Sequence, residues 1–272
     1  MSAPLRVGFI GLGSQGGPMA RQIIEAGFPT TLWARRVETL EPYADTSATI
    51  AASRHEVGEA SDVLGVCVVD DAGVEQVLRG ADGALAGMAP GSVVVIHSTV
   101  HPDTCTQLAT DHPYLAFLDA PVSGGGHMAT AKQLLVMVGG DVDVLDRCRP
   151  VFETFANPLV HVGPLGTAQQ AKLLNNALFT AHLGLAADVF AIGRERGLDS
   201  DALGTLLLAG SARSYGLEVV AGAGHTVDRM AEIAGPLLAK DVHILTELLA
   251  PSRPRLIDSA TETLRGMGLE SS

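Results

Sequence analysis

The stretch VGFIGLGSQGGPMARQIIEAG, residues Val7–Gly27, decides the fold of the first half of the chain. It opens with a short apolar run, continues with Gly11, Gly13 and Gly16 in a G-x-G-x-x-G pattern, and ends in an amphipathic segment. In a strand–turn–helix unit, the first glycine permits a tight turn and the second lets the backbone approach a pyrophosphate. The third lets the helix pack closely on the strand, and the pyrophosphate then lies at the positive helix N-terminus. The stretch therefore predicts a dinucleotide-binding unit, in preference to a glycine-rich turn without a ligand.

Composition sets limits on the function. The 272 residues are 47% hydrophobic and 18% charged, which is enough for a large core in one or two domains. The net charge of −12 disfavours an electrostatic grip on nucleic acid or anionic lipid. Cys67, Cys105 and Cys148 lie far apart and fit neither a disulfide framework nor a metal cluster, so no metal site is predicted. The sequence shows no N-terminal apolar leader and no uninterrupted apolar run long enough for a bilayer, so we expect a soluble, cytoplasmic protein without a membrane partner.

The first half of the chain alternates short apolar runs with amphipathic stretches. This alternation predicts βαβ units and a mostly parallel sheet. The runs LGVCVV and SVVVI are apolar on both faces, as expected for strands that helices cover on both sides. The predicted strands are Arg6–Ile10, Thr30–Trp33, Asp62–Val69, Ser92–Ile96, Leu115–Asp119 and Leu134–Val138. Helices are predicted between most of them, for example at Gln15–Ala26 and Pro102–Thr110.

The character of the sequence changes after His161. Residues 167–196 contain no proline, and a helix of that length spans roughly 45 Å at about 1.5 Å per residue. Further helical segments follow, and no strand pattern returns. The predicted fold is α/β, with a Rossmann-type N-terminal dinucleotide-binding domain at residues 1–162. An all-α C-terminal domain follows at residues 163–272 and begins with the long interdomain helix.

The end of the second predicted strand bears on the type of dinucleotide. An acidic residue there would hydrogen-bond a ribose 2′-hydroxyl, whereas arginine accommodates a 2′-phosphate. The sequence TLWARRVETL has no acidic residue at the strand end and places Arg35 and Arg36 just beyond it. This favours NADP(H), and NAD(H) stays open because both arginines could simply be solvated. The predicted cofactor-binding residues of the glycine motif and this turn are Gly11, Leu12, Gly13, Ser14, Gln15, Gly16, Arg35 and Arg36.

Four motifs follow one another along nearly the whole chain. They are GLGSQGGPMA (Gly11–Ala20), LDAPVSGG (Leu118–Gly125), GPLGTAQQAKLLNN (Gly163–Asn176) and AKD (Ala239–Asp241). Together they resemble the β-hydroxyacid dehydrogenase family, which includes 3-hydroxyisobutyrate dehydrogenases and tartronate semialdehyde or glyoxylate/succinic semialdehyde reductases. The resemblance implies an NAD(P)-dependent enzyme that moves a hydride between nicotinamide and a short β-hydroxyacid or its semialdehyde.

The resemblance also implies roles for particular residues. Ser123, Gly124 and Gly125 would hold the substrate carboxylate, since small residues expose backbone N–H groups and a hydroxyl to an anion. Lys172 would donate a proton to the carbonyl oxygen as hydride arrives, with Asn176 at i+4 on the same helix face. The further residues that the resemblance places near the cofactor are Val68, Val69, Thr99 and Lys240. For Lys240, an exposed or ion-paired lysine is a nearly equal alternative.

The chain departs from the family pattern at four positions. Gln15 stands where the family usually has methionine. Met128 and Lys132 stand where two glycines usually follow the second motif, and Ile233 stands where an aromatic side chain often closes the pocket. These departures leave the identity of the substrate open and do not touch the residues of hydride transfer.

Other functions fit the sequence less well. An imine reductase resembles the family but usually replaces the lysine with aspartate or tyrosine, so Lys172 argues against it. A 6-phosphogluconate dehydrogenase is usually much longer and needs a basic cluster for its substrate. A non-catalytic NADP(H)-binding protein would not need Lys172, Asn176 and Ser123, and a methyltransferase has no use for the long helix. We therefore expect an NADP(H)-preferring oxidoreductase with a small carboxylate-bearing substrate and no nucleic-acid partner, assembled as a homodimer or homotetramer as in relatives.

Overall fold

The computed structural model describes residues 4–269, and the chain divides into two compact units, Met1–Lys172 and Leu173–Ser272. The division falls within the long helix α8 (Thr167–Glu195). The sequence instead places a domain boundary at residues 162 and 163, just before this helix, and that boundary stays a prediction.

The N-terminal unit is built on one nine-stranded sheet. The strands are β1 (Val7–Ile10), β2 (Thr30–Trp33), β3 (Thr49–Ile50), β4 (Val63–Val66), β5 (Val93–Ile96), β6 (Ala116–Asp119), β7 (Val122–Ser123), β8 (Leu134–Gly139) and β9 (Ala156–Gly163). Their order is β3-β2-β1-β4-β5-β6-β8-β7, and β9 pairs with β8. All pairs from β3 to β6 are parallel, and the order 3-2-1-4-5-6 is that of the doubly wound dinucleotide-binding fold. The predicted Rossmann-type fold is confirmed.

Some strands differ from the sequence prediction. β4 ends at Val66, so the last predicted strand residues belong to the following turn. β3 and β7 have two residues each, too few to show an alternating pattern. β9 contains Pro158 and is largely exposed, and its pairing with β8 includes register shifts. Proline lacks the N–H donor and is tolerated at a sheet edge, where a sequence pattern gives little sign of a strand.

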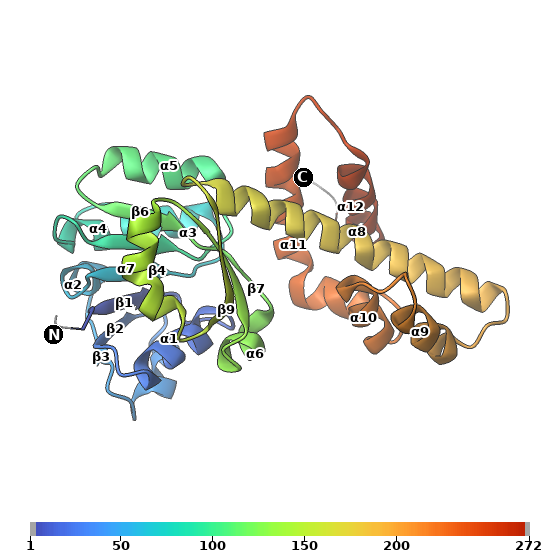
Figure 1. Cartoon of the computed structure of the whole chain (residues 1–272), viewed down its shortest axis with the longest axis horizontal. Coiled ribbons are helices and arrows are strands. Elements are labelled where there is room, and N and C mark those ends of the chain that lie inside the picture. Colours follow the sequence, from blue (N-terminus) through green and yellow to red (C-terminus); the bar gives the residue numbers. More distant parts are fainter. Residues whose placement is uncertain (1–3, 270–272) are drawn as a thin grey trace. The chain divides into compact units, whose positions relative to one another are not determined.

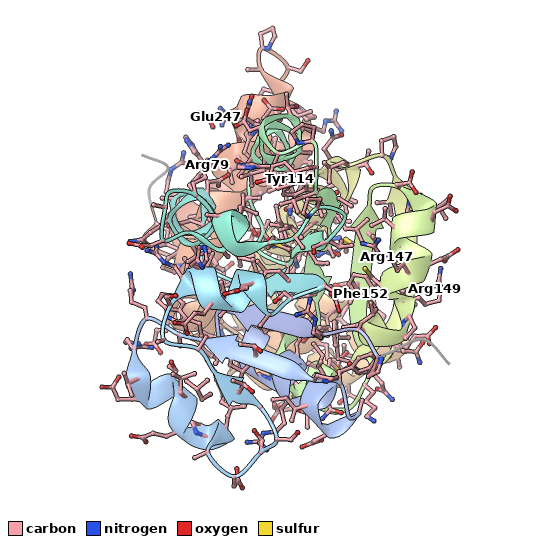
Figure 2. The ribbon with its side chains drawn as sticks, turned by 90° about the vertical axis from the view of Figure 1, so that its left-hand side faces the viewer. Arg79, Tyr114, Arg147, Arg149, Phe152 and Glu247 are labelled. Atoms are coloured by element: carbon pink, nitrogen blue, oxygen red, sulfur yellow. The ribbon has the colours of Figure 1, made fainter. Side chains whose placement is uncertain are left out.

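Helices cover both faces of this sheet (Figure 1). They are α1 (Gly16–Glu25), α2 (Arg54–Glu59), α3 (Asp71–Leu78), α4 (Ala84–Gly87), α5 (Pro102–Asp111), α6 (Gly125–Thr130) and α7 (Val142–Phe152), with a 3₁₀ segment η1 (Val37–Tyr43). One face packs against α1 and α7, and the other against α2 to α5. Figure 2 shows this division on α7, where Phe152 points to the buried side and Arg149 lies at the surface. Burial on both faces accounts for the apolar strands of the sequence.

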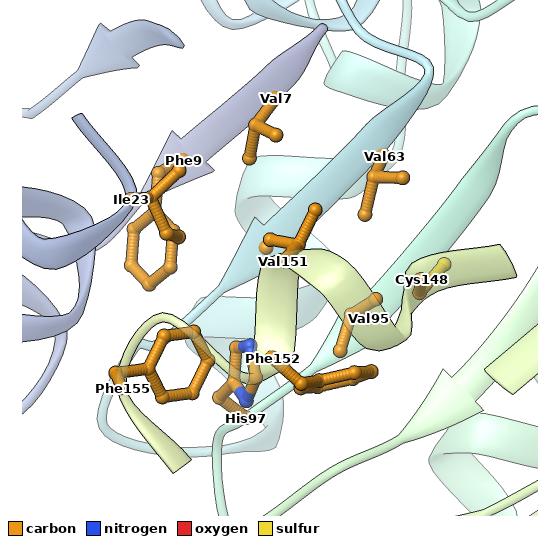
Figure 3. Close-up of a pocket in the computed structure, with 11 residues that line it drawn as sticks. Val7, Phe9, Ile23, Val63, Val95, His97, Cys148, Val151, Phe152 and Phe155 are labelled. Carbon is orange, nitrogen blue, oxygen red and sulfur yellow. The ribbon is translucent and has the colours of Figure 1, made fainter. Parts of the chain in front are cut away.

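A buried histidine lies at the end of β5, between the sheet and α7. His97 stacks on Phe9 at 6.0 Å between ring centroids, and its ring edge meets Phe152 at 6.0 Å and Phe155 at 5.9 Å. Figure 3 shows the imidazole between the last two rings. Its Nδ1 is 2.8 Å from the carbonyl oxygen of Ala120. Burial lowers the pKa of His97 to about 4, against the opposing effect of this hydrogen bond, so the ring is neutral near pH 7.

The C-terminal unit consists of helices among its described residues. They are the greater part of α8, α9 (Ser200–Ala209), α10 (Tyr215–Gly222), α11 (Asp228–Leu249) and α12 (Arg255–Gly266). Their core includes Leu183, Phe190 and Ile257. A Cβ on Gly184 would collide with Thr263, so α8 and α12 pack closely at this point. The predicted long helix and the all-α C-terminal region are confirmed.

Helix α8 is, by length and composition alone, long and apolar enough to cross a membrane. The sequence expectation concerned an uninterrupted apolar run, and polar residues such as Lys172, Asn176 and Asp188 interrupt this helix, so the expectation is not contradicted. Core helices of soluble proteins pass the same test, and α8 buries Leu173, Ala177 and Leu183 in the core of its unit. The absence of a membrane partner stays a prediction.

Candidate functional site

The three glycines of the first motif occupy different surroundings. Gly11 has φ 99°, and a Cβ there would collide with the carbonyl oxygen of Cys67. A Cβ on Gly16 would collide with the carbonyl oxygen of Gly11 and approach the Cβ of Cys67 to 2.9 Å. Gly13 is exposed, and no described atom lies within 4 Å of the place its Cβ would take. Two glycines thus serve the turn and the packing, and the third leaves open space at the loop, as a pyrophosphate site requires.

The N-terminus of α1 has the features of an anion-binding site. No described side chain caps this helix, and its first turn has no acidic residue. Gln15 holds the N-cap position, and its Nε2 is buried without a hydrogen-bond partner among residues 4–269. The neighbouring Ser14 is exposed, whereas Leu12 is buried. The first N–H groups of a helix lack intrahelical partners and favour negative charge, so the residues present fit the phosphates of a dinucleotide.

Arg35 and Arg36 are both exposed in the turn after β2. Arg36 is the N-cap of η1. The last residue of η1, Tyr43, contacts the first turn of α1. There the hydroxyl of Tyr43 donates to the carbonyl oxygen of Gly17 at 2.9 Å, and the guanidinium of Arg21 lies 5.4 Å from the Tyr43 ring centroid. The arginine turn is therefore attached to the first turn of the helix that follows the glycine loop.

The second motif lies beside the first. A Cβ on Gly126 would collide with the carbonyl oxygen of Ser14 and lie 3.1 Å from Cγ of Pro18, so α6 packs on the start of α1. The turn Ser123–Gly125 immediately precedes this contact and is half-buried. Its two glycines have φ 131° and 75°, a region that L side chains rarely adopt. The predicted carboxylate turn and the predicted phosphate loop are therefore neighbours.

The departures from the family pattern have visible structural consequences. Met128 packs against the second motif, because a Cβ on Gly124 would lie 2.9 Å from Cγ of Met128. Lys132 is exposed and has φ 58°, a conformation that glycine adopts without steric cost. Ile233 is 64% exposed on α11. Lys132 thus has a left-handed backbone conformation that would favour glycine at this position.

A buried carboxylate joins the second motif to the third. Asp119, at the end of β6, is fully buried. One of its oxygens accepts from the N–H of Gly166 at 2.8 Å, and the other from the N–H of Gln169 at 2.8 Å. Burial raises the pKa of Asp119, and these backbone donors act in the opposite direction. The carboxylate therefore holds the first turn of α8, the helix that carries Lys172.

Gln169 connects the same turn to the loop after β5. Its Oε1 accepts from the N–H of Val100 at 3.1 Å, and its Nε2 donates to the carbonyl oxygen of Ser98 at 2.9 Å. These contacts bracket Thr99, which is half-buried. The loop is also attached to the turn after β4, because the N–H of Val68 donates to Oγ of Ser98 at 2.8 Å. Val69, the next residue, is 66% exposed.

The lysine motif continues along α8. Lys172 is 8% exposed and lies four residues before Asn176. Within the C-terminal unit, Nδ2 of Asn176 donates to Asp241 at 2.5 Å, and Nζ of Lys240 forms an ion pair with Asp241 at 2.7 Å. Lys240 is thus ion-paired, as its alternative interpretation expected, and its place beside the cofactor stays a prediction. The sequence reasoning missed Asp241 as a partner of Asn176, although the AKD motif contains it.

Comparison with known proteins identifies the family. The family profile described as the NAD binding domain of 6-phosphogluconate dehydrogenase matches residues 6–163. The profile described as NAD-binding of NADP-dependent 3-hydroxyisobutyrate dehydrogenase matches residues 166–256. The chain belongs to the β-hydroxyacid dehydrogenase family. Members of this family are NAD(P)-dependent hydroxyacid dehydrogenases, and the chain is accordingly an oxidoreductase that acts on CH–OH groups with a nicotinamide cofactor.

Three relatives in this family illustrate the similarity. An NAD-dependent L-serine dehydrogenase of Pseudomonas aeruginosa is 32% identical over 251 residues, which cover 89% of the chain and 84% of the relative. The mitochondrial 3-hydroxyisobutyrate dehydrogenase of Mus musculus is 29% identical over 277 residues, covering 98% and 83%. The crystal structure of a 3-hydroxyisobutyrate dehydrogenase from Salmonella typhimurium superposes with a TM-score of 0.84 at 27% identity, over 96% of this chain and 93% of that one.

Proposed function

We propose that the chain is an NADP(H)-preferring oxidoreductase that transfers a hydride between nicotinamide and a short β-hydroxyacid or its semialdehyde. The observation that carries the proposal is the contact between motifs in the N-terminal unit. Gly126 packs on Ser14, and Asp119 binds the backbone of Gly166 and Gln169, so the first three motifs adjoin one another. The names of two relatives support the substrate class, since L-serine and 3-hydroxyisobutyrate both carry a carboxylate and a β-hydroxyl.

The cofactor preference rests on the two exposed arginines. Arg35 and Arg36 follow β2, where side chains would bind the 2′-phosphate of NADP(H). No acidic side chain at that strand end would instead bind a ribose 2′-hydroxyl. The glycine loop and the uncapped start of α1 would hold the pyrophosphate. Val68, Val69, Thr99 and Lys240 are the further proposed cofactor contacts.

The chemistry needs a proton at the substrate oxygen. The bound cofactor supplies or accepts the hydride. In the direction of reduction, Nζ of Lys172 stabilises the developing negative charge and donates its proton to the oxygen, and in oxidation it accepts this proton. Asn176 orients the reacting groups from the next turn of α8. The Ser123 hydroxyl and the backbone N–H groups of Gly124 and Gly125 hold the substrate carboxylate.

Titration with NADPH and with NADH tests the cofactor preference. Trp33 lies at the end of β2, next to the arginine turn, and its fluorescence is the signal to be followed. We expect NADPH to bind at least about tenfold more tightly than NADH, a difference of about 1.4 kcal/mol. Arg35→Ala should remove most of this difference, whereas Arg149→Ala on the exposed side of α7 should not. Tighter binding of NADH, or an equal loss for both cofactors, would contradict the arginine interpretation.

Substitution of Lys172 tests the proton donor. Lys172→Ala should lower kcat for L-serine or 3-hydroxyisobutyrate oxidation by about 10²–10⁴-fold, the usual contribution of general acid–base catalysis. The Kd for NADPH should change little. Gln170→Ala, an exposed residue of the same turn, is the control. If Lys172→Ala keeps its turnover, Lys172 is not the proton donor.

We also infer that the protein forms a homodimer or homotetramer. Support comes from α8, where Leu174, Leu178, Leu185, Val189 and Ile192 are exposed in each case by more than a third. Their spacings of four, seven, four and three residues keep them on one side of the helix. A cytoplasmic location is proposed from composition alone, and cell fractionation tests it.

A further inference from the structure

Two buried side chains outside the proposed catalytic set connect the loop after β5 to the first turn of α8. Gln169 and Asp119 are both fully buried, and neither is on the surface where substrate or cofactor would bind. We propose that Gln169, held in place by Asp119, is a positioning residue that fixes the backbone around Thr99 relative to Lys172. The inference rests on the proposed function, because it concerns the geometry of that reaction.

The primary amide of Gln169 matches the backbone that it meets. Its oxygen accepts from the N–H of Val100 at 3.1 Å, and its nitrogen donates to the carbonyl oxygen of Ser98 at 2.9 Å. One side chain thereby satisfies both the donor and the acceptor that flank Thr99. A hydrocarbon side chain in the same place would leave both buried groups unpaired, which costs more than the loss of the hydrogen bonds alone.

The same loop is anchored from two other directions. Oγ of Ser98 accepts from Val68 N–H at 2.8 Å. The carboxylate of Asp71, in the first turn of α3, accepts from the N–H of His101 at 2.9 Å and from the hydroxyl of Thr104 at 2.6 Å. These hydrogen bonds attach the loop to the turn after β4 and to the start of α3. Gln169 adds the hydrogen bonds that attach the loop to α8.

Asp119 makes this connection rigid. It accepts from the backbone N–H of Gln169 at 2.8 Å, so both the backbone and the side chain of that residue are held. Lys172 follows three residues later, on the same side of the helix. A shift of the first turn of α8 would therefore move the lysine relative to Thr99. Misplacement by about 1 Å can lower the rate of an enzyme by about 10²-fold, because the reacting groups leave their productive geometry.

The test compares Gln169→Leu with Gln170→Leu, its exposed neighbour in the same turn. For Gln169→Leu we expect kcat to fall by about 10–100-fold, while the Kd for NADPH stays within about threefold of wild type. The primary deuterium isotope effect on kcat, measured with 4-deuterated NADPH and a semialdehyde substrate, should rise because hydride transfer becomes rate-limiting. Gln170→Leu should leave all three quantities unchanged. A kcat equal to that of wild type in Gln169→Leu would overturn the proposal.

A second variant guards against loss of folding. Gln169→Glu can accept from Val100, and when protonated it can also donate to Ser98, so its kcat should exceed that of Gln169→Leu and increase towards low pH relative to wild type. Equal behaviour of the two variants at every pH would also overturn the positioning role.

Hydrogen exchange separates this inference from the proposed function. The peptide that contains residues 98–101 should exchange faster in Gln169→Leu, where the N–H of Val100 loses its acceptor, than in Gln170→Leu, whether or not any substrate is turned over. An inactive wild type would refute the proposed function, and unchanged exchange in both Gln169 variants would refute the connection itself.

Discussion

At the scale of single residues, Gly13 and Gly16 differ in what a methyl group would meet. A Cβ on Gly13 would enter open space, whereas a Cβ on Gly16 would collide with the backbone of Gly11. Gly13→Ala should therefore leave the free energy of unfolding nearly unchanged and weaken NADPH binding by about tenfold or more, because the methyl group lies where the backbone approaches the phosphate. Gly16→Ala should also lower the free energy of unfolding, by about 1–3 kcal/mol.

Chemical denaturation and NADPH titration of both variants measure these effects. Gly266→Ala, in α12 of the other unit, also enters open space and serves as the control for a harmless methyl group. Unchanged NADPH affinity in Gly13→Ala would show that the open space beside this glycine does not receive the cofactor.

The residues that sequence reasoning missed share one property, the distance along the chain to their partners. Asp119 meets Gly166 and Gln169 from 47 and 50 residues away, and Asn176 meets Asp241 from 65 residues away. A motif shows which residue types occur close together in sequence, and it cannot show which distant group each one contacts. The acid at the end of the apolar run AFLD was the available signal for Asp119, since a buried carboxylate requires hydrogen-bond partners.

At the scale of elements, the long periodic or apolar segments were predictable and the short ones were not. The sequence placed α8 at residues 167–196, and the helix runs from Thr167 to Glu195. β7 has two residues and is defined by its pairing with β8, which no local pattern records. The packing of β5, β6 and α7 around His97 was not predicted either, because a lone histidine in an apolar run does not reveal its burial.

The packing around His97 predicts a pH dependence of stability. The unfolded chain binds a proton at this histidine with a pKa near 6.5, and the folded chain does so only near pH 4. Between these values the unfolded state holds more protons, so stability is fully present above about pH 6.5 and declines as the pH falls towards 4. The difference of about 2.5 pKa units corresponds to a loss on the order of 3 kcal/mol. Chemical denaturation of the wild type across this pH range measures the decline.

Substitution by glutamine isolates the contribution of this histidine. His97→Gln keeps a donor for the carbonyl oxygen of Ala120 but takes up no proton, so the decline between pH 6.5 and 4 should be much shallower in this variant. His127→Gln, at an exposed position on α6, should retain the slope of the wild type. Parallel curves for wild type and His97→Gln would contradict the assignment.

At the scale of the whole molecule, the four motifs and their order in the sequence indicated the family. Only the structure shows which motifs contact one another. The first motif touches, at Ser14, the residue Gly126 that directly follows the second motif, and the second motif touches the third through Asp119. Within the C-terminal unit, the third touches the fourth through Asn176 and Asp241. Each contact is either a hydrogen bond between polar groups or a glycine packed so closely on another backbone that a side chain would not fit. Hydrophobic periodicity could not have predicted any of them.

The exposed stripe on α8 leads to a prediction for the assembled protein. Leu178 and Leu185 are about half exposed on the same side of this helix, and a second copy of the chain would remove them from water. The wild type should sediment as a dimer or tetramer at micromolar concentration. Leu185→Glu should shift it towards monomer, with the dissociation constant raised by at least about tenfold, because an unpaired carboxylate is costly to bury. Val142→Glu, at an exposed position on α7, should leave the assembly unchanged. A wild type that sediments as a monomer would contradict the proposed oligomer and leave the Gln169 and Lys172 predictions untouched, since those concern one chain.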